Sequence, residues 1–257
     1  MALRRKTKWR YDPRPYLLQA ATVTNIGNVR GRNEDRAFVE AGCFGVSDGM
    51  GGVGGGNVAA EKASSRFVRS IREGCSPMTA INDAHREVIS VAQSPDGVSG
   101  MGATLCAGVF GIREQTPSMA LINVGDSRAY LARSGEGLRL LTRDQRWVQA
   151  QVDAGVITPE AARHHPNRNI LTSVVGGLNA YDPSIEFIEP RPGDQYIFCT
   201  DGITDELSDE ALEEFVQTAA NFEQLAHDLV NTVLEGAARD NATIVVVSVL
   251  DSPRPLP

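Results

Sequence analysis

Segments with helical patterns and segments with strand patterns are segregated along this chain. Apolar residues recur with helical spacing over two adjacent segments, 57–72 and 78–92, and again over 208–219 and 222–235. Strand patterns cover residues 17–25, 36–40, 43–47, 103–110, 118–124, 127–133, 138–141, 184–189, 195–199 and 242–250. A doubly wound parallel fold would alternate one strand with one helix. The order instead predicts an α+β fold, a central antiparallel β-sandwich with a pair of helices outside each sheet.

The division of the chain into domains follows from its length and from the absence of linkers. The 257 residues contain no internal repeat and no linker-like stretch, and this length suits one large domain. We expect one domain over 17–251, with tails at 1–16 and 252–257. Six basic residues lie in the N-terminal tail, but the apolar stretch of a signal peptide does not follow them.

Charge and cysteine usage restrict the partners and the compartment. The net charge of −7 disfavours nucleic acid as a partner, and no apolar run is long enough to cross a bilayer. No two of the four cysteines form a C-x-x-C pair, and Cys43, Cys106 and Cys199 lie in apolar runs typical of buried thiols. We therefore expect reduced cysteines and a cytoplasmic protein.

Acidic residues stand where several predicted strands begin or end. Asp48, Asp126, Asp201 and Asp240 each lie next to a strand and beside glycine or asparagine, and Asp35 precedes the strand at 36–40. If these ends meet, the carboxylates repel one another and require cations, and oxygen ligands favour Mg²⁺ or Mn²⁺. Two such ions about 3.5–4 Å apart can activate a water for attack on phosphorus.

A phosphate-binding group is also needed, and Arg30 is the candidate. Guanidinium geometry matches that of phosphate, and Arg30 lies five residues before Asp35. The alternative is a solvated surface arginine, which spacing alone leaves open.

Six motifs in order resemble the metal-dependent protein serine/threonine phosphatases of type 2C, especially their compact bacterial branch. The resemblance extends from about residue 20 to residue 250 and rests on GNVRGRNEDR, VSDGMGG, GDSRAYL, ITPEAARHHPNRNILT, CTDGITD and ARDNATIVVV. It implies a β-sandwich between helix pairs and hydrolysis of phosphoserine or phosphothreonine on a protein, which a serine/threonine kinase would have phosphorylated. We expect a monomer.

The resemblance also implies residue roles. Asp48 would bridge two Mn²⁺ or Mg²⁺ ions, and the Gly49 carbonyl would bind one of them. Asp201 and Asp240 would complete the second ion's shell, with Asp35 acting through water. Asp126 with Asp201 resembles the family's weaker third-metal site. Arg30 stands at the position of the phosphate-binding arginine, and segment 142–175 resembles the family's mobile flap.

The sequence departs from the family pattern at several positions near the site. Val53 stands where bacterial members carry histidine, Gln145 and Arg146 replace the histidine and serine of a D-H-S motif, and Ser173 replaces an arginine. Val53 can transfer no proton, so His165 in the flap is the alternative general acid, although a solvated histidine would fit the sequence as well.

Three other interpretations each agree with part of the sequence. GMGGVG at 49–54 matches the dinucleotide-binding pattern G-x-G-x-x-G, but Asp48 would repel the pyrophosphate and the following helix is succeeded by another helix. A non-catalytic phosphoprotein-binding module would explain Val53 and Gln145, but it would not need clustered acids. A phosphatase of a bacterial sigma-factor switch protein would share the proposed chemistry.

Overall fold

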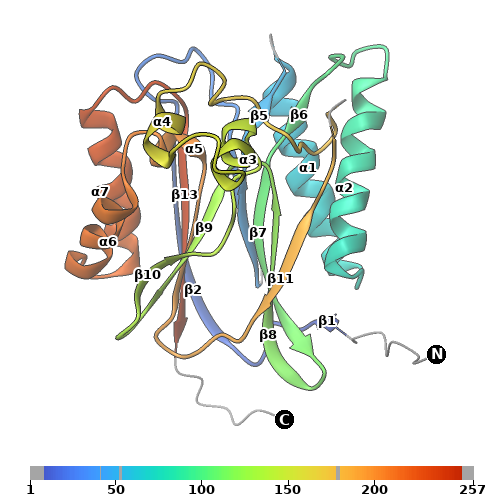
Figure 1. The fold of residues 1–257 in the computed structure, drawn as a ribbon. Helices are drawn as coiled ribbons and strands as arrows, with labels where there is room; N and C mark the ends of the chain where they lie inside the picture. Colours follow the sequence, from blue (N-terminus) through green and yellow to red (C-terminus); the bar gives the residue numbers. More distant parts are fainter. Residues whose placement is uncertain (1–8, 41, 52–53, 178–179, 251–257) are drawn as a thin grey trace.

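Two antiparallel β-sheets lie face to face at the centre of the structure, a computed structural model that describes residues 9–40, 42–51, 54–177 and 180–250 (Figure 1). The first sheet has the order β11 (Ser184–Ile188), β8 (Thr116–Val124), β7 (Leu105–Arg113), β4 (Cys43–Ser47) and β3 (Arg36–Glu40), and β1 (Trp9–Tyr11) also pairs with β7. The second has the order β10 (Gly137–Leu140), β9 (Arg128–Arg133), β12 (Gln195–Cys199), β13 (Ala242–Leu250) and β2 (Leu17–Asn25).

A helix pair covers the outer face of each sheet, as Figure 1 shows. Helices α1 (Gly55–Arg72) and α2 (Pro77–Ala92) pack on the first sheet, and α6 (Asp209–Thr218) and α7 (Phe222–Glu235) on the second. The prediction of an α+β sandwich between helix pairs is confirmed.

The helices begin and pack as their sequences dictate. In α1 the buried positions include Ala60, Ala63, Phe67 and Ile71, which recur at helical spacing toward the sheet. Helix α2 begins after Ser76, whose hydroxyl accepts a hydrogen bond from the Thr79 amide and which is followed by proline.

The sheets are held together by a large apolar layer. Phe110 packs edge-on against both Phe44 and Tyr196, with ring centroids 5.9 Å apart in each pair. β13, an interior strand of the second sheet, is buried from Ala242 to Val249, in agreement with its mostly apolar sequence. The ends of the strands are therefore held in place by the close-packed apolar layer between the two sheets.

Several short elements are not predicted by the sequence patterns. β5 (Gly49–Met50) pairs with β6 (Gly102–Ala103), and α5 (Asp201–Thr204) follows β12. Asp201, which the sequence places at the end of a strand, is instead the first residue of α5. β1 lies within the segment expected to be a tail and pairs with β7 from Trp9↔Arg113 to Tyr11↔Gly111.

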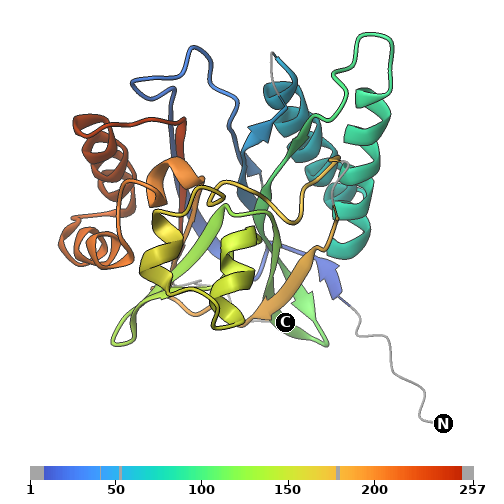
Figure 2. The ribbon, with the colours of Figure 1, turned by 45° about the horizontal axis from the view of Figure 1, so that its top comes forward.

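The flap segment contains two short helices, α3 (Trp147–Asp153) and α4 (Pro159–Arg163). In Figure 1, α3 and α4 lie at the same end of the sandwich as β5, β6 and α5. Figure 2 shows the molecule with this end turned forward. Isolated bridges, Ala103↔Val175 and Arg146↔Leu171, tie the flap to β6 and to itself. The flap therefore lies over one set of strand ends.

All four cysteines are free, and Cys43, Cys106 and Cys199 are buried. Burial raises the pKa of the Cys199 thiol to about 12 and that of the Cys106 thiol well above its usual value. None of the described helices is long and apolar enough to span a membrane.

Candidate metal centre

The five acids predicted at strand ends are brought to the same end of the sandwich. Asp35 precedes β3, Asp48 lies between β4 and β5, and Asp126 lies in the turn from β8 to β9. Asp201 opens α5, and Asp240 precedes β13. Because β3 runs antiparallel to β4, and β12 to β13, the start of one strand lies beside the end of its neighbour.

Hydrogen bonds join these turns across the two sheets. The Thr200 hydroxyl donates to Asp35 Oδ2 at 2.8 Å, and the Glu34 amide donates to Asn241 Oδ1 at 2.8 Å. The Asp48 amide donates to Thr104 Oγ1 at 2.9 Å, and this hydroxyl lies 2.7 Å from Ser127 Oγ. The turns that carry the acids therefore support one another.

Burial and mutual repulsion raise the pKa of the central acids. Burial raises the pKa of Asp48 well above its usual value, and the charges of Asp35, Asp201, Asp126 and Asp240 add to the effect. Burial likewise raises the pKa of Asp35 to about 7, although hydrogen bonding, which includes the 2.8 Å bond from Thr200, opposes the shift. At Asp48 and Asp35 a proton or a bound cation is therefore favoured over an uncompensated negative charge.

The centre has the features that a hard divalent cation requires. Asp35 is 3% exposed, and its Oδ1 has no hydrogen-bond partner among the described residues. Carboxylate and carbonyl oxygens are the ligands that Mg²⁺ and Mn²⁺ prefer. The donor set fits such an ion.

Gly49, the predicted carbonyl ligand, lies against the first turn of α1. A Cβ at Gly49 would lie 2.0 Å from the Gly56 carbonyl oxygen, and one at Gly56 would lie 2.6 Å from the Gly49 oxygen. Only glycine permits this backbone approach, which brings the peptide that follows Asp48 to the first turn of α1.

Across the described ranges, no three His, Cys, Asp or Glu side chains are arranged to hold an ion by themselves. Two of the acids contact arginines instead. Arg30 Nη2 donates to Asp240 Oδ2 at 2.6 Å, and Arg146 Nη2 donates to Asp201 Oδ2 at 2.8 Å. An ion at this centre would draw on backbone oxygen and water as well as on carboxylates.

Arg30, the predicted phosphate-binding residue, lies at the edge of the centre beside Asp240. Its side chain is 53% exposed. The hydrogen bond to Asp240 raises the pKa of Arg30, and the charges of Asp48 and Asp201 also contribute. Its guanidinium therefore faces both the acids and solvent.

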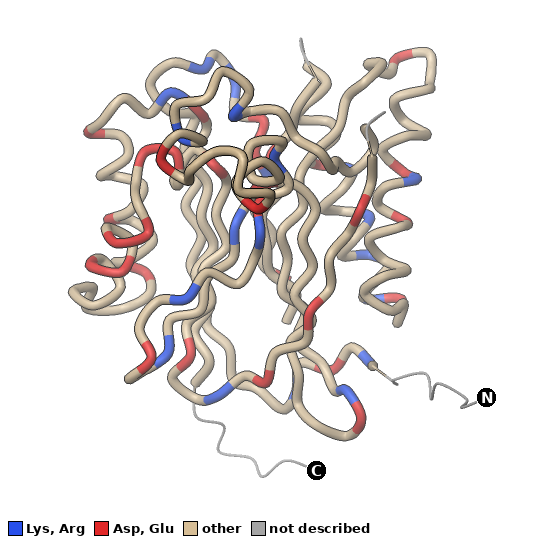
Figure 3. The backbone as a smooth tube through the Cα atoms, in the orientation of Figure 1, with Lys and Arg blue, Asp and Glu red and all other residues tan. Residues whose placement is uncertain are grey.

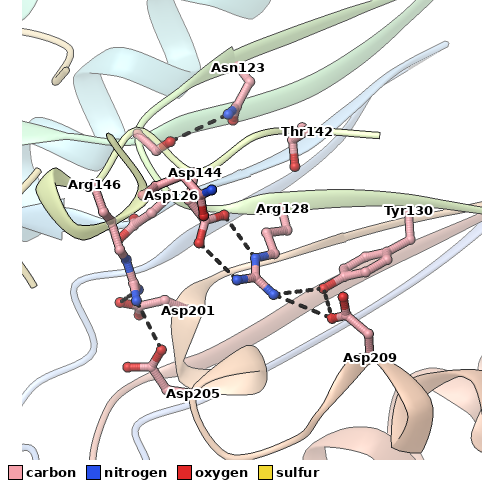
Figure 4. A network of polar contacts seen from close by, with 12 residues as sticks. Asn123, Asp126, Arg128, Tyr130, Thr142, Asp144, Arg146, Asp201, Asp205 and Asp209 are labelled. Atoms are coloured by element: carbon pink, nitrogen blue, oxygen red, sulfur yellow. Dashed lines mark hydrogen bonds and ion pairs between the residues drawn. The ribbon is translucent and has the colours of Figure 1, made fainter. Parts of the chain in front are cut away.

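Arg146 is a further functional candidate. In the sequence it is marked only by its departure from the family's D-H-S motif. Figure 4 shows it between Asp126, Asp201 and Asp205. Arg146 Nε donates to Asp126 Oδ2, and Nη1 donates to Asp205 Oδ1 at 3.2 Å. Burial alone lowers the pKa of Arg146, but the three carboxylates outweigh it and hold the pKa above its usual value.

Neighbouring flap residues are fixed to the same turn. Gln145 accepts a hydrogen bond from the Gly125 amide at 2.7 Å and donates to the Asp182 carbonyl at 2.7 Å. Arg128 forms two hydrogen bonds of 2.8 Å with Asp144, as Figure 4 shows. Figure 3 shows acidic and basic positions together at this end of the strands.

His165, the predicted alternative to the family's histidine as general acid, contacts other residues of the flap. His165 packs against Trp147 with the two rings tilted and their centroids 5.1 Å apart, and its Nδ1 accepts a hydrogen bond from the Asn167 amide at 3.0 Å. These contacts lie within the flap. Val53 lies outside the described residues.

Comparison with known proteins identifies the family. Residues 32–237 match the family model described as protein phosphatase 2C. The chain belongs to the protein phosphatase 2C family. This agrees with the resemblance inferred from the six motifs.

Relatives within this family include bacterial serine/threonine phosphatases. The serine/threonine protein phosphatase PstP of Mycobacterium tuberculosis is 36% identical over 242 residues, which are 91% of this chain and 46% of PstP. The chain thus spans about half the length of that relative. The serine/threonine phosphatase Stp of Listeria monocytogenes is 28% identical over 90% of this chain and 95% of its own length.

Solved structures of the PstP phosphatase share the fold. One crystal structure superposes with a TM-score of 0.82 at 32% identity, covering 91% of this chain and 99% of that chain. Another, of the PstP catalytic domain in complex with two manganese ions, superposes with a TM-score of 0.81 at 32% identity.

Proposed function

We propose that this protein phosphatase 2C domain is a metal-dependent serine/threonine protein phosphatase. The observation that carries the proposal is the meeting of Asp35, Asp48, Asp201 and Asp240 at one end of the sandwich, where burial raises the pKa of the central acids. Such a group of acids is costly without cations and is suited to a reaction that requires them.

Asp48, the Gly49 carbonyl, Asp201 and Asp240 would hold two Mn²⁺ or Mg²⁺ ions, with Asp35 behind them. When bound, two such ions supply charge neutralisation and an activated water for attack on a phosphate ester. The two manganese ions of the PstP catalytic domain support this number.

Arg30 would bind the phosphate oxygens. Its guanidinium is half exposed and lies against Asp240, so a phosphate that approaches the centre from solvent meets it first. Charge-assisted hydrogen bonds of this kind orient the phosphate. Proton donation to the leaving serine or threonine oxygen would come from His165 or from water.

The substrate class follows from the family and from the exposed setting of Arg30. We propose phosphoserine and phosphothreonine in proteins that a serine/threonine kinase phosphorylates, with a sigma-factor switch protein as one such substrate. We also propose that the domain acts as a monomer in the cytoplasm, where its cysteines stay reduced.

The deciding experiment is turnover on matched phosphoserine, phosphothreonine and phosphotyrosine peptides, with Mn²⁺ and with EDTA. We expect release of phosphate from the first two peptides in Mn²⁺ and none in EDTA. An Asp48→Asn variant with native circular dichroism is the control and should be inactive. Binding without turnover would indicate a phosphoprotein-binding module instead.

A further inference from the structure

We propose that the guanidinium of Arg146 takes the place of a third metal ion beside Asp126 and Asp201, so that this chain binds two ions and no more. The inference rests on the proposed function for the two ions. It differs from the sequence-based expectation, in which Asp126 and Asp201 form a weaker third-metal site. The chain therefore supplies this third cation itself.

Arg146 engages a different carboxylate with each of its three nitrogens. Nε donates to Asp126, Nη2 donates to Asp201 at 2.8 Å, and Nη1 donates to Asp205 at 3.2 Å. The three acids come from the β8–β9 turn, from the start of α5 and from the residue that follows α5. A guanidinium has enough N–H donors to satisfy all three.

The Arg146 side chain occupies a buried position among its carboxylate partners and is not a surface side chain. Its side chain is 9% exposed, and that of Asp126 is 5% exposed. A positive charge so little hydrated is retained because its partners are negative. A metal ion could bind Asp126 in only two ways. Either a dication would be buried beside the Arg146 guanidinium, or the Arg146 side chain would have to move out of its position.

Hydrogen bonds fix the backbone on both sides of Arg146. The Gln145 amide donates to the Gly125 carbonyl at 3.0 Å, and the Trp147 amide donates to the Ile170 carbonyl at 2.8 Å. The Thr172 amide donates to the Gln145 carbonyl at 2.7 Å. Arg146 is thus anchored on both sides, immediately before α3.

This arrangement fastens the flap to the acid centre. A metal ion at Asp126 would leave when the free metal concentration falls, whereas a covalently attached guanidinium stays. The start of α3 is therefore held at Asp126, which is not a ligand of the two proposed ions, at any metal concentration. Arg146 acts here as a positioning residue.

The test is to count bound ions in the full chain. Crystals soaked in MnCl₂ should show two manganese peaks in anomalous maps of the wild type, and equilibrium dialysis with metal analysis should give the same number. Arg146→Ser should gain a third ion beside Asp126. The double variant Arg146→Ser/Asp126→Asn should return to two, and Arg146→Lys, which keeps the charge, should also bind two.

Three ions in the wild type, or two in Arg146→Ser, would overturn the inference. The wild-type count decides the question even if Arg146→Ser does not fold. No bound ion in the wild type would contradict the proposed function itself, and the inference would fall with it. The two failures are therefore distinguishable.

Discussion

Arg30 and Asp240 form an ion pair of 2.6 Å, although the sequence analysis assigns them different partners, phosphate for one and metal for the other. The contact shows that both side chains reach the same place. Since Asp240 is a proposed metal ligand, an ion that binds it would compete for its charge and release Arg30 toward a phosphate.

Replacing Arg30 tests its role. In Arg30→Ala we expect KM for a phosphoserine peptide to rise about ten- to hundredfold, because a hydrogen bond to a charged group contributes roughly 1.5–3 kcal/mol. The affinity for Mn²⁺ should rise rather than fall, because Arg30 no longer competes with the ion for Asp240. Steady-state kinetics and metal titration measure both. Arg191→Ala, at an exposed arginine paired with Glu136, is the control, and unchanged KM in Arg30→Ala would make Arg30 a surface charge.

Asp35 predicts a pH dependence of the metal-free protein. Its folded pKa of about 7 lies above the usual value of 3.8, so the folded state binds the proton more tightly than the unfolded state does. Stability from this group is full below pH 4 and is lost as the pH rises toward 7. Each pH unit between the two pKa values is worth about 1.4 kcal/mol.

We therefore expect the urea midpoint of the metal-free protein to fall between pH 5 and pH 7.5 and that of the Asp35→Asn variant to fall less. Mn²⁺ binding should release protons, so its affinity should rise over the same range. Titration calorimetry in buffers of different ionisation enthalpy measures this release. A midpoint that rises with pH equally in both proteins would contradict the assignment.

At the residue scale, the sequence predicted the acids but not their arginine partners. Asp48 and Asp201 stand beside recognisable strands, so strand order suffices to bring them together. Arg146 reaches Asp126 only because the flap returns over the strand ends, and that path depends on hydrogen bonds such as Gln145 to Gly125. The change from serine to arginine was a signal, but spacing alone assigned it no partner.

At the scale of the elements, a polar network of side chains joins the flap to β9 of the second sheet and to α6. Arg128 on β9 pairs with Asp144 at the start of the flap and also lies 3.4 Å from Asp209 at the start of α6. The Tyr130 hydroxyl donates to Asp209 at 2.8 Å. Sheet, flap and α6 are thus fixed to one another by side chains of which Tyr130 and Asp144 are buried.

Removing Arg128 should weaken this connection. Arg128→Ala leaves Asp144, 8% exposed, without its partner, so we expect the free energy of unfolding to fall by about 3 kcal/mol. Arg72→Ala, which breaks the exposed pair with Glu40, should cost less than about 1 kcal/mol. Urea denaturation measures both. Equal losses in the two variants would argue against a special role for the network.

The long elements were predictable, and the short ones were not. The pattern over 57–72 becomes α1, because eighteen residues allow a helical period to be recognised. β5, β6 and α5 have two, two and four residues, too few for any period. β1 lies in a basic segment, and its pairing with β7 is decided by contacts far along the chain.

The molecule as a whole places a group of like charges at the end of a well-packed sandwich. The apolar layers stabilise the fold, and the acids oppose it by repulsion. A divalent cation that binds only the folded state relieves this repulsion. Metal binding should therefore be visible in global stability.

We expect Mn²⁺ to raise the melting temperature and EDTA to lower it. At a free concentration one hundred times Kd, binding adds about 2.7 kcal/mol for each site. Differential scanning fluorimetry measures the shift. Asp48→Asn should lose most of the increase, and an increase retained in that variant would place the ions elsewhere.

The buried thiols have a consequence for oxidative stress. Peroxide reacts with thiolate, and enzymes that use an exposed cysteine nucleophile are inactivated in this way. Here the pKa of Cys199 is about 12, Cys43 and Cys106 are equally buried, and the acid centre consists of oxygen ligands. Alkylating reagents should modify partly exposed Cys75 first. We therefore expect the proposed phosphatase activity to persist under oxidation that inactivates cysteine-dependent phosphatases.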